Sequence, residues 1–378
     1  MRPQIDPFLA VGISVLAQKL RAEGRSIIPM SFGQPSTGAP RAALEVAHRV
    51  LDTEPGGYWE SAPLRERIAR HYDESYGVKV APEQIILTCG ASPALVLALS
   101  STFAPGDRVA TARPGYVAYR NNLKALNLVP VEISCGAESR FQITAAHIEA
   151  LNPAPAGLII SSPANPTGTI IEAEELAKIA RVCRERGIRI ISDEIYHGLS
   201  YVEPAHSMLE FEPDTLVVNS FSKYFSMVGW RLGWLLAPKA DLARARAYVG
   251  NLFLTAPWLS QHVALAAMDA GDELDANVAV YRANRALLLD TLPQLGLQAI
   301  APPDGAFYIY ADVTHLTGDS MAFCKALLND TGVSIAPGID FDPVEGPGYI
   351  RISFASSTAQ VEEGIARMIP WFAAQTRL

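Results

Sequence analysis

The most constraining feature of the sequence is the repeated alternation of short apolar runs with amphipathic segments between residues 84 and 236. The apolar runs QIILT, RVATA, LVPVEI, GLIIS, IRIIS, TLVVN and RLGWLLA are rich in Ile, Val and Leu, as buried strands are. Several of the segments between them have apolar residues at helical spacing. This alternation predicts an α/β fold whose large domain holds a mostly parallel, seven-stranded sheet covered by helices on both faces.

The rest of the chain predicts a smaller α+β domain. Helical spacing at the N-terminal end stops at Gly24, and interrupted helical stretches follow the last apolar run, with a break at Pro257. Beyond a helix predicted over residues 281–292, the runs AFYIYADV, VSIAPG and YIRISFA alternate with two further predicted helices. We expect the N-terminal segment to pack with this C-terminal part. The predicted division is 1–39 for the N-terminal segment, 40–280 for the large domain and 281–378 for the small C-terminal domain.

Composition excludes several classes of protein. Hydrophobic residues make up 49% of the chain and charged residues 19%, so a sizeable core is available. The net charge of −8, without any Lys/Arg-rich tract, disfavours nucleic acids and anionic membranes as partners. The four cysteines lack metal-ligand spacing, so we expect no metal site and a reducing compartment. We expect a cytoplasmic protein because neither a signal peptide nor an apolar run of about 20 residues is present.

The loops that follow the apolar runs carry the chemically active residues. In parallel sheets, ligands bind outside the carboxyl ends of the strands, so these loops should meet at one site. CGAS opens a helix and leaves backbone N–H groups free for an anion. Asn165 lies between prolines in SPANPTG, Asp193 ends an apolar run with Tyr196 three residues later, and Tyr116 could cover a flat ligand. Taken singly, these residues could equally form a turn, a buried salt bridge, a helix cap or core packing.

Lys223 follows the run TLVVN within SFSKYFSMVGWRLG, with Ser220 and Ser222 before it and Arg231 after it. A lysine at the carboxyl end of a buried strand is partly removed from water, so its charge must be paired or its proton lost. A neutral lysine forms Schiff bases with aldehydes. The two hydroxyls and the guanidinium suit a phosphate on that aldehyde. By itself the segment could be a surface lysine beside a Ser-rich turn. Together with the acid, the flat ring and the anion loop, it meets the requirements of pyridoxal 5′-phosphate.

Arg351 lies in YIRISFA, which alternates like a strand with one polar position facing inward. Its planar fork of N–H groups suits bidentate binding of a carboxylate. The alternative is an arginine on the solvent side of an edge strand.

The motifs SPANPTG, SDEIY, SFSKYFSMVGWRLGW and GYIRISFA resemble, in order and spacing, those of the class I and II aminotransferases, the fold-type I enzymes of the aspartate and aromatic aminotransferase superfamily. The resemblance extends from about Phe32 to the C-terminus. It implies an enzyme that moves an amino group between an L-amino acid and a 2-oxo acid through a Schiff base between Lys223 and pyridoxal 5′-phosphate.

The resemblance also implies individual roles. Lys223, Asp193 and Tyr196 would be catalytic, with Asp193 at the pyridinium nitrogen and Tyr196 and Asn165 at the ring oxygen. A homodimer is implied too, because Tyr58 falls where a tyrosine reaches the partner subunit's phosphate. The remaining roles are phosphate binding by Gly90, Ala91, Ser92, Ser220, Ser222 and Arg231, ring stacking by Tyr116, and substrate binding by Gly33, Asn165 and Arg351.

The sequence departs from the family pattern in two loops. YWESAPLRE is shorter than the usual loop after the tyrosine at position 58, and GQPSTGAP replaces the commoner Gly-Glu-Pro start. No obvious second arginine is present for a side-chain carboxylate. A C–S β-lyase or a decarboxylase on the same fold remains an alternative. A non-catalytic regulator is disfavoured because only a short, non-basic segment precedes the matching region, and a nucleotide enzyme because GxxxxGK[ST] and GxGxxG are missing.

Overall fold

The computed structural model describes residues 5–375, so the outermost ends of the predicted N-terminal and C-terminal segments, 1–4 and 376–378, lie outside the described residues. Its centre is a seven-stranded sheet in the order β2-β8-β7-β6-β5-β3-β4. β8 is antiparallel to both of its neighbours, and the other adjacent strands are parallel. The predicted mostly parallel sheet is therefore confirmed. Its strands are β2 (Ile85–Thr88), β3 (Arg108–Arg113), β4 (Val129–Ser134), β5 (Gly157–Ser161), β6 (Arg189–Asp193), β7 (Leu216–Ser220) and β8 (Gly233–Leu236).

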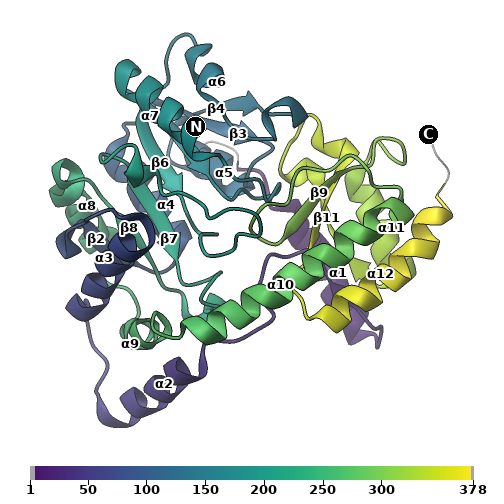
Figure 1. Cartoon of the computed structure of the whole chain (residues 1–378), viewed down its shortest axis with the longest axis horizontal. Coiled ribbons are helices and arrows are strands. Elements are labelled where there is room, and N and C mark those ends of the chain that lie inside the picture. The colour runs from purple at the N-terminus through teal and green to yellow at the C-terminus, as the bar shows by residue number, and fades with distance from the viewer. Residues whose placement is uncertain (1–4, 376–378) are drawn as a thin grey trace.

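Helices cover both faces of this sheet, as predicted (Figure 1). Successive residues of a strand point to opposite faces, so Ile190 and Ile191 of β6 enter different cores. Ile191 packs in the core that includes α4 (Ala91–Thr102), α5 (Val117–Ala125) and α8 (Lys239–Leu252), and Ile190 packs with α6 (Ala145–Glu149) and α7 (Ala173–Arg186). A further core joins the sheet to α2 (Arg41–Thr53), α3 (Ala62–Tyr76) and α9 (Trp258–Ala267).

A smaller part combines the two ends of the chain, which confirms the predicted α+β companion. Antiparallel strands form a sheet in the order β11-β12-β9, and β1 pairs with β10 in parallel. Ile13 and Leu20 of the N-terminal helix share one core with Leu327 and Ile365. The elements are α1 (Leu9–Ala22), β1 (Ile28–Pro29), β9 (Tyr308–Asp312), α11 (Ser320–Thr331), β10 (Val333–Ser334), β11 (Ala336–Pro337), β12 (Tyr349–Ser353) and α12 (Thr358–Ala373).

The long helix α10 (Gly271–Thr291) joins the two parts (Figure 1). It begins at Gly271, whereas the sequence predicted a helix only from residue 281. Asp272 and Glu273 occupy its first turn, where acidic side chains complement the helix dipole. Leu274 packs into a core of the large sheet, whereas Leu288 packs into the core of the smaller part. One continuous helix thus spans residue 280, and the predicted domain boundaries stay predictions.

Within the described residues, no helix has the length and apolar content needed to cross a membrane.

Candidate active site

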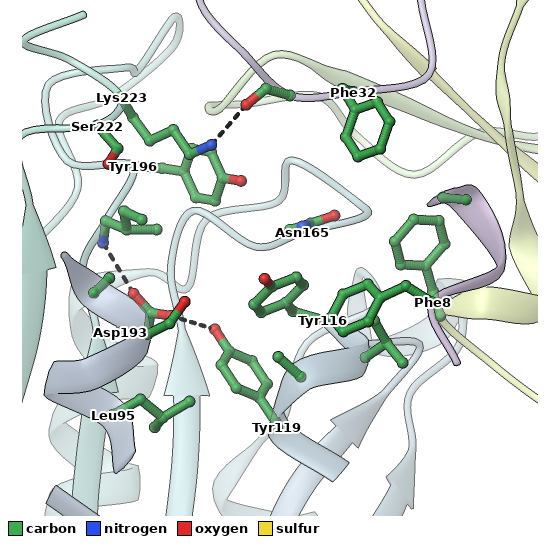
Figure 2. A pocket seen from close by; sticks show the side chains of 18 of the residues that line it. Phe8, Phe32, Leu95, Tyr116, Tyr119, Asn165, Asp193, Tyr196, Ser222 and Lys223 are labelled. Carbon is green, nitrogen blue, oxygen red and sulfur yellow. Dashed lines mark hydrogen bonds between the residues drawn. The ribbon is translucent and has the colours of Figure 1, made fainter. Parts of the chain in front are cut away.

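A cavity of about 230 Å³ lies where the large sheet meets the smaller part (Figure 2). Loops that follow β3, β5, β6 and β7 form one side, and residues from both ends of the chain form the other. The sequence-predicted residues that line it are Gly33, Ala91, Ser92, Tyr116, Asn165, Asp193, Tyr196, Ser222, Lys223, Arg231 and Arg351. The fold therefore brings together predicted residues that are far apart along the chain: Gly33 and Arg351, which both line this cavity, are 318 positions apart.

Lys223 lies in the turn after β7 and points its amine into the cavity. Its Nζ donates a hydrogen bond of 2.6 Å to the carbonyl oxygen of Gly33 (Figure 2). Burial, together with the positive charges of Arg351 and Arg231, lowers the pKa of Lys223 to about 8, whereas Asp193 opposes this shift. A substantial fraction of this lysine is therefore neutral near pH 8, which is the form that attacks an aldehyde.

Asp193 ends β6, and both of its carboxylate oxygens are held. The Tyr119 hydroxyl donates to Oδ2 at 2.6 Å, and the Ile195 N–H donates to Oδ1 at 3.2 Å (Figure 2). Burial raises the pKa of Asp193 to about 6, although these hydrogen bonds and Lys223 act in the opposite direction. A fully buried acid with this pKa is ready to pair with a cation that enters the cavity.

The start of α4 has the geometry to hold an anion. The first internal hydrogen bond of this helix runs from the Ala94 N–H to the Gly90 carbonyl, so the N–H groups of Ala91 and Ser92 precede the helical ladder. Gly90 has φ +103°, and a β-carbon there would lie 2.5 Å from Nη2 of Arg231. Glycine at position 90 thus gives the guanidinium of Arg231 room to lie close to the helix N-terminus.

Arg351 lies in β12, the central strand of its sheet, and only 4% of it is exposed. The edge-strand alternative is therefore wrong. Its Nη1 donates to Oδ1 of Asn165 at 2.6 Å, and its Nη2 donates to the Ser31 carbonyl at 2.6 Å. The guanidinium lies 4.3 Å from the ring centroid of Tyr308. Nε of Arg351 is buried without a hydrogen-bond partner in the described part of the chain, which favours an anionic ligand.

Three predicted residues do not line the cavity. Gly90 lies behind Ala91 and Ser92, and Ser220 lines a different cavity, where its Oγ accepts a hydrogen bond from the Ser222 N–H. Tyr58 is 84% exposed and lies away from the cavity of its own chain. The phosphate role of Ser220 stays a prediction, and in this structure its hydroxyl supports the turn that carries Ser222 and Lys223.

Several cavity residues were missed by sequence reasoning. Tyr119 lies one helical turn after Tyr116, so its spacing was a usable signal. Tyr308 lies on β9 in the run AFYIYADV, where strand alternation did not indicate which tyrosine faces a ligand. The apolar residues Phe8, Phe32 and Phe341 line the cavity from distant segments, and no motif marked them.

These groups fit pyridoxal 5′-phosphate. A lysine with a lowered pKa faces a buried acid across the cavity, and a glycine-dependent anion site lies beside them. The ring of Tyr116 packs edge to face against the rings of Tyr119 and Phe8, with centroid distances of 5.5 and 6.1 Å (Figure 2). The cavity therefore offers an amine, an acid, an aromatic surface and an anion cradle in one place.

Comparisons with known proteins agree with this chemistry. The profile of the aminotransferase class I and II family matches residues 25–368. Valine–pyruvate aminotransferase of Mycobacterium tuberculosis is 43% identical over 99% of this chain and 98% of its own length. A crystal structure of an aminotransferase from Mycobacterium tuberculosis has a TM-score of 0.96 at 43% identity over 98% of both chains. The aspartate aminotransferase of Thermus thermophilus with maleate has a TM-score of 0.90 at 30% identity over 97% of both chains.

The chain therefore belongs to the class I and II aminotransferase family. It depends on pyridoxal 5′-phosphate and moves an amino group between an L-amino acid and a 2-oxo acid. The relatives named above are aminotransferases, which favours transamination over the lyase, decarboxylase and regulator alternatives.

Proposed function

We propose that Lys223 binds the cofactor's aldehyde and, once released, moves the proton from the substrate's Cα. Its lowered pKa supports this role, because a general base works best when its pKa lies near the working pH. When bound, the cofactor supplies an electron sink for the negative charge that develops at Cα. Asp193 holds the ring nitrogen protonated, and its ionised form is supported by Tyr119 and the Ile195 N–H.

The other predicted residues complete this assignment. Tyr196 and Asn165 face the ring oxygen, and Tyr116 provides the stacking surface. The phosphate lies at the N-terminus of α4, beside Ser222 and Arg231. Arg351 binds the substrate's α-carboxylate, and its buried Nε, which has no hydrogen-bond partner among the described residues, supports this role. Gly33 contacts the substrate while its carbonyl holds the free amine of Lys223.

The substrate is an L-amino acid with a neutral, apolar side chain. The cavity lining includes Phe8, Phe32 and Phe341, and the ring centroid of Phe341 lies 4.5 Å from the Arg351 guanidinium. The cations that line the cavity, among the described residues, are Lys223, Arg231 and Arg351. Asp340 also lines it, but its carboxylate accepts hydrogen bonds from the Leu9 and Ala10 N–H groups and caps α1. These cations already have proposed roles, and no further cation lines the described cavity to bind the side chain of an aspartate substrate. Asp340 is likewise engaged by α1 and does not serve as the partner of a lysine substrate. The similarity to a valine–pyruvate aminotransferase supports valine as donor and pyruvate as acceptor.

Two measurements test these assignments. Borohydride reduction of the holoenzyme followed by peptide mapping should find the cofactor on Lys223, and modification of another lysine would overturn the assignment. A panel of donors against pyruvate, 2-oxoglutarate and oxaloacetate should then favour valine and similar apolar amino acids over aspartate. A preference for aspartate would overturn the proposed substrate class.

The enzyme acts as a homodimer. Exposed apolar residues gather where the loop after α2 meets α9: Tyr58 is largely exposed, and Trp59 stacks on His262 with 4.6 Å between the ring centroids. Leu51 on α2 and Leu254 before α9 add further exposed apolar surface. An interface here buries this surface and brings Tyr58 toward the partner's phosphate site.

A hybrid experiment tests the role of Tyr58 across the interface. Lys223→Ala and Tyr58→Phe chains should each be impaired alone. Mixed dimers should regain activity, because the site that keeps Lys223 then receives an intact Tyr58 from its partner. If mixing restores nothing while light scattering shows mixed dimers, Tyr58 does not serve the partner's site.

Two further predictions concern organisation. The large unit spans residues 40–280, and the small unit combines residues 1–39 and 281–378. The enzyme acts in the cytoplasm, which its four free cysteines support because reducing compartments preserve thiols. Limited proteolysis and cell fractionation test these two predictions.

A further inference from the structure

Tyr308, which no sequence motif marked, contacts three predicted site residues: Tyr196, Arg351 and Gly33. Its hydroxyl lies 2.7 Å from the hydroxyl of Tyr196, and the two rings meet edge to face at 5.7 Å. The face of its ring lies 4.3 Å from the guanidinium carbon of Arg351. Its hydroxyl also lies against Gly33, where a β-carbon would come within 1.7 Å of the oxygen. Tyr308 is buried and lines the cavity.

The number of available protons and acceptors determines which of Tyr196 and Tyr308 donates the hydrogen bond between them. Each hydroxyl carries a single proton, and within the part of the chain that the structure describes each finds only the other as partner. If Tyr196 donated to Tyr308, the Tyr308 proton would lack an acceptor in a buried place, and Tyr196 could not donate to the cofactor. If Tyr308 donates, both protons are used. An accepted hydrogen bond also polarises a hydroxyl and makes it a stronger donor.

We propose that Tyr308 is a positioning residue that donates its proton to Tyr196, directs the Tyr196 proton toward the cofactor's ring oxygen, and supports Arg351 with its ring. This inference rests on the proposed function, because it takes Tyr196 as the partner of the ring oxygen and Arg351 as the carboxylate binder. The two contacts are separable, since one belongs to the hydroxyl and the other to the ring.

Tyr308→Phe removes the hydroxyl and keeps the ring. A donor on the ring oxygen stabilises its ionised form, so a weaker donor raises the pH midpoint of the bound cofactor's visible absorbance. We expect a rise of roughly half a pH unit, the size of one neutral hydrogen bond, with an unchanged KM for the amino acid. The sign is decisive: if Tyr196 instead donated to Tyr308, the substitution would free its proton and the midpoint would fall. An unchanged or lowered midpoint overturns the proposal.

Tyr308→Leu removes the ring as well, and the KM of the amino donor should rise roughly tenfold beyond that of the Phe variant, because Arg351 loses its aromatic face. An equal KM in both variants overturns the part of the proposal that concerns Arg351. Tyr310→Phe is the matched control. Tyr310 is two residues further along β9 and equally buried, stacks on Tyr349 at 4.9 Å, and lies outside the cavity lining. It should leave both the midpoint and KM unchanged.

Borohydride reduction of the wild-type enzyme distinguishes a failure of the proposed function from a failure of the role proposed for Tyr308. If borohydride does not fix the cofactor on Lys223, the proposed function fails, and this inference fails with it. If the cofactor is fixed there but the Tyr308→Phe midpoint does not rise, only the inference about Tyr308 fails.

Discussion

The Tyr119 hydroxyl donates to the carboxylate of Asp193 at 2.6 Å, and the two side chains are buried together beneath the cavity (Figure 2). This contact joins the first turn of α5 to the end of β6. It counters burial, which by itself drives the acid toward its neutral form. The role proposed for Asp193, which is to hold a protonated ring nitrogen, therefore depends partly on Tyr119.

Tyr119→Phe should weaken cofactor binding by roughly tenfold and lower kcat, since a hydrogen bond to a charged group is lost. The pKa of Asp193 should rise further above about 6, so the acidic limb of the kcat profile should move to higher pH. Absorbance titration of the cofactor-free enzyme measures the affinity. Tyr76→Phe is the control, because it removes a hydroxyl bond of 2.7 Å to His197 outside this cavity. Equal effects of both substitutions would contradict a specific role for Tyr119.

Asp193→Asn should stabilise the cofactor-free protein at neutral pH while it impairs the holoenzyme. The folded state holds the Asp193 proton more tightly than the unfolded chain, because burial raises its pKa from 3.8 to about 6. As pH rises through this window, Asp193 therefore costs the fold stability, and the full cost remains above it. The gain in the free energy of unfolding should be roughly 1–3 kcal/mol at about pH 7 and should shrink toward pH 4. Urea denaturation at several pH values measures it, and a gain independent of pH would contradict this account.

Arg351→Lys should raise KM for both the amino acid and the 2-oxo acid by roughly ten- to hundredfold, because an ammonium cannot replace the planar fork. The guanidinium donates to Asn165 and to the Ser31 carbonyl at the same time, and one ammonium cannot reach both in that geometry. Steady-state kinetics with both substrates test this prediction. Arg282→Lys is a suitable control, because Arg282 donates to the carbonyls of Tyr201 and Ser200 away from this cavity. An unchanged KM in the Arg351 variant would remove it as the carboxylate binder.

Gly90→Ala should destabilise the protein by roughly 1–3 kcal/mol and weaken cofactor binding, since the residue needs positive φ. The added carbon would also lie 2.5 Å from Nη2 of Arg231 and displace it from the helix N-terminus. Gly250→Ala in α8 is the control, because open space surrounds that position. It should leave cofactor binding unchanged and raise stability by roughly 0.5–1 kcal/mol. Thermal unfolding and cofactor titration of both variants separate the two cases.

The helix α10 shows where local pattern fails to define an element. Of its first ten residues only Leu274 is buried, and Gly271, Asp272, Asp275 and Asn277 are poor helix formers, so local propensity does not mark this part as helix. The large domain and the smaller part each bury one portion of this helix. Tertiary packing therefore extends it beyond the segment that periodicity predicted.

The sequence by itself determined the α/β architecture and identified eleven of the residues that line the cavity. Strand periodicity reports burial directly, and the loops after parallel strands must converge at one edge of the sheet. Lys223, Asp193, Asn165 and Arg351 were identifiable because polar groups beside apolar strands need a partner.

Only the tertiary structure decided how these groups are held. It placed Tyr119 on Asp193 and Tyr308 on both Tyr196 and Arg351, brought the phenylalanines of distant segments to one wall, and left Tyr58 outside its own cavity. The physical reason is that a side chain's direction and its hydrogen-bond partner depend on how separate elements pack. The spacing of residues along one element does not predict that packing.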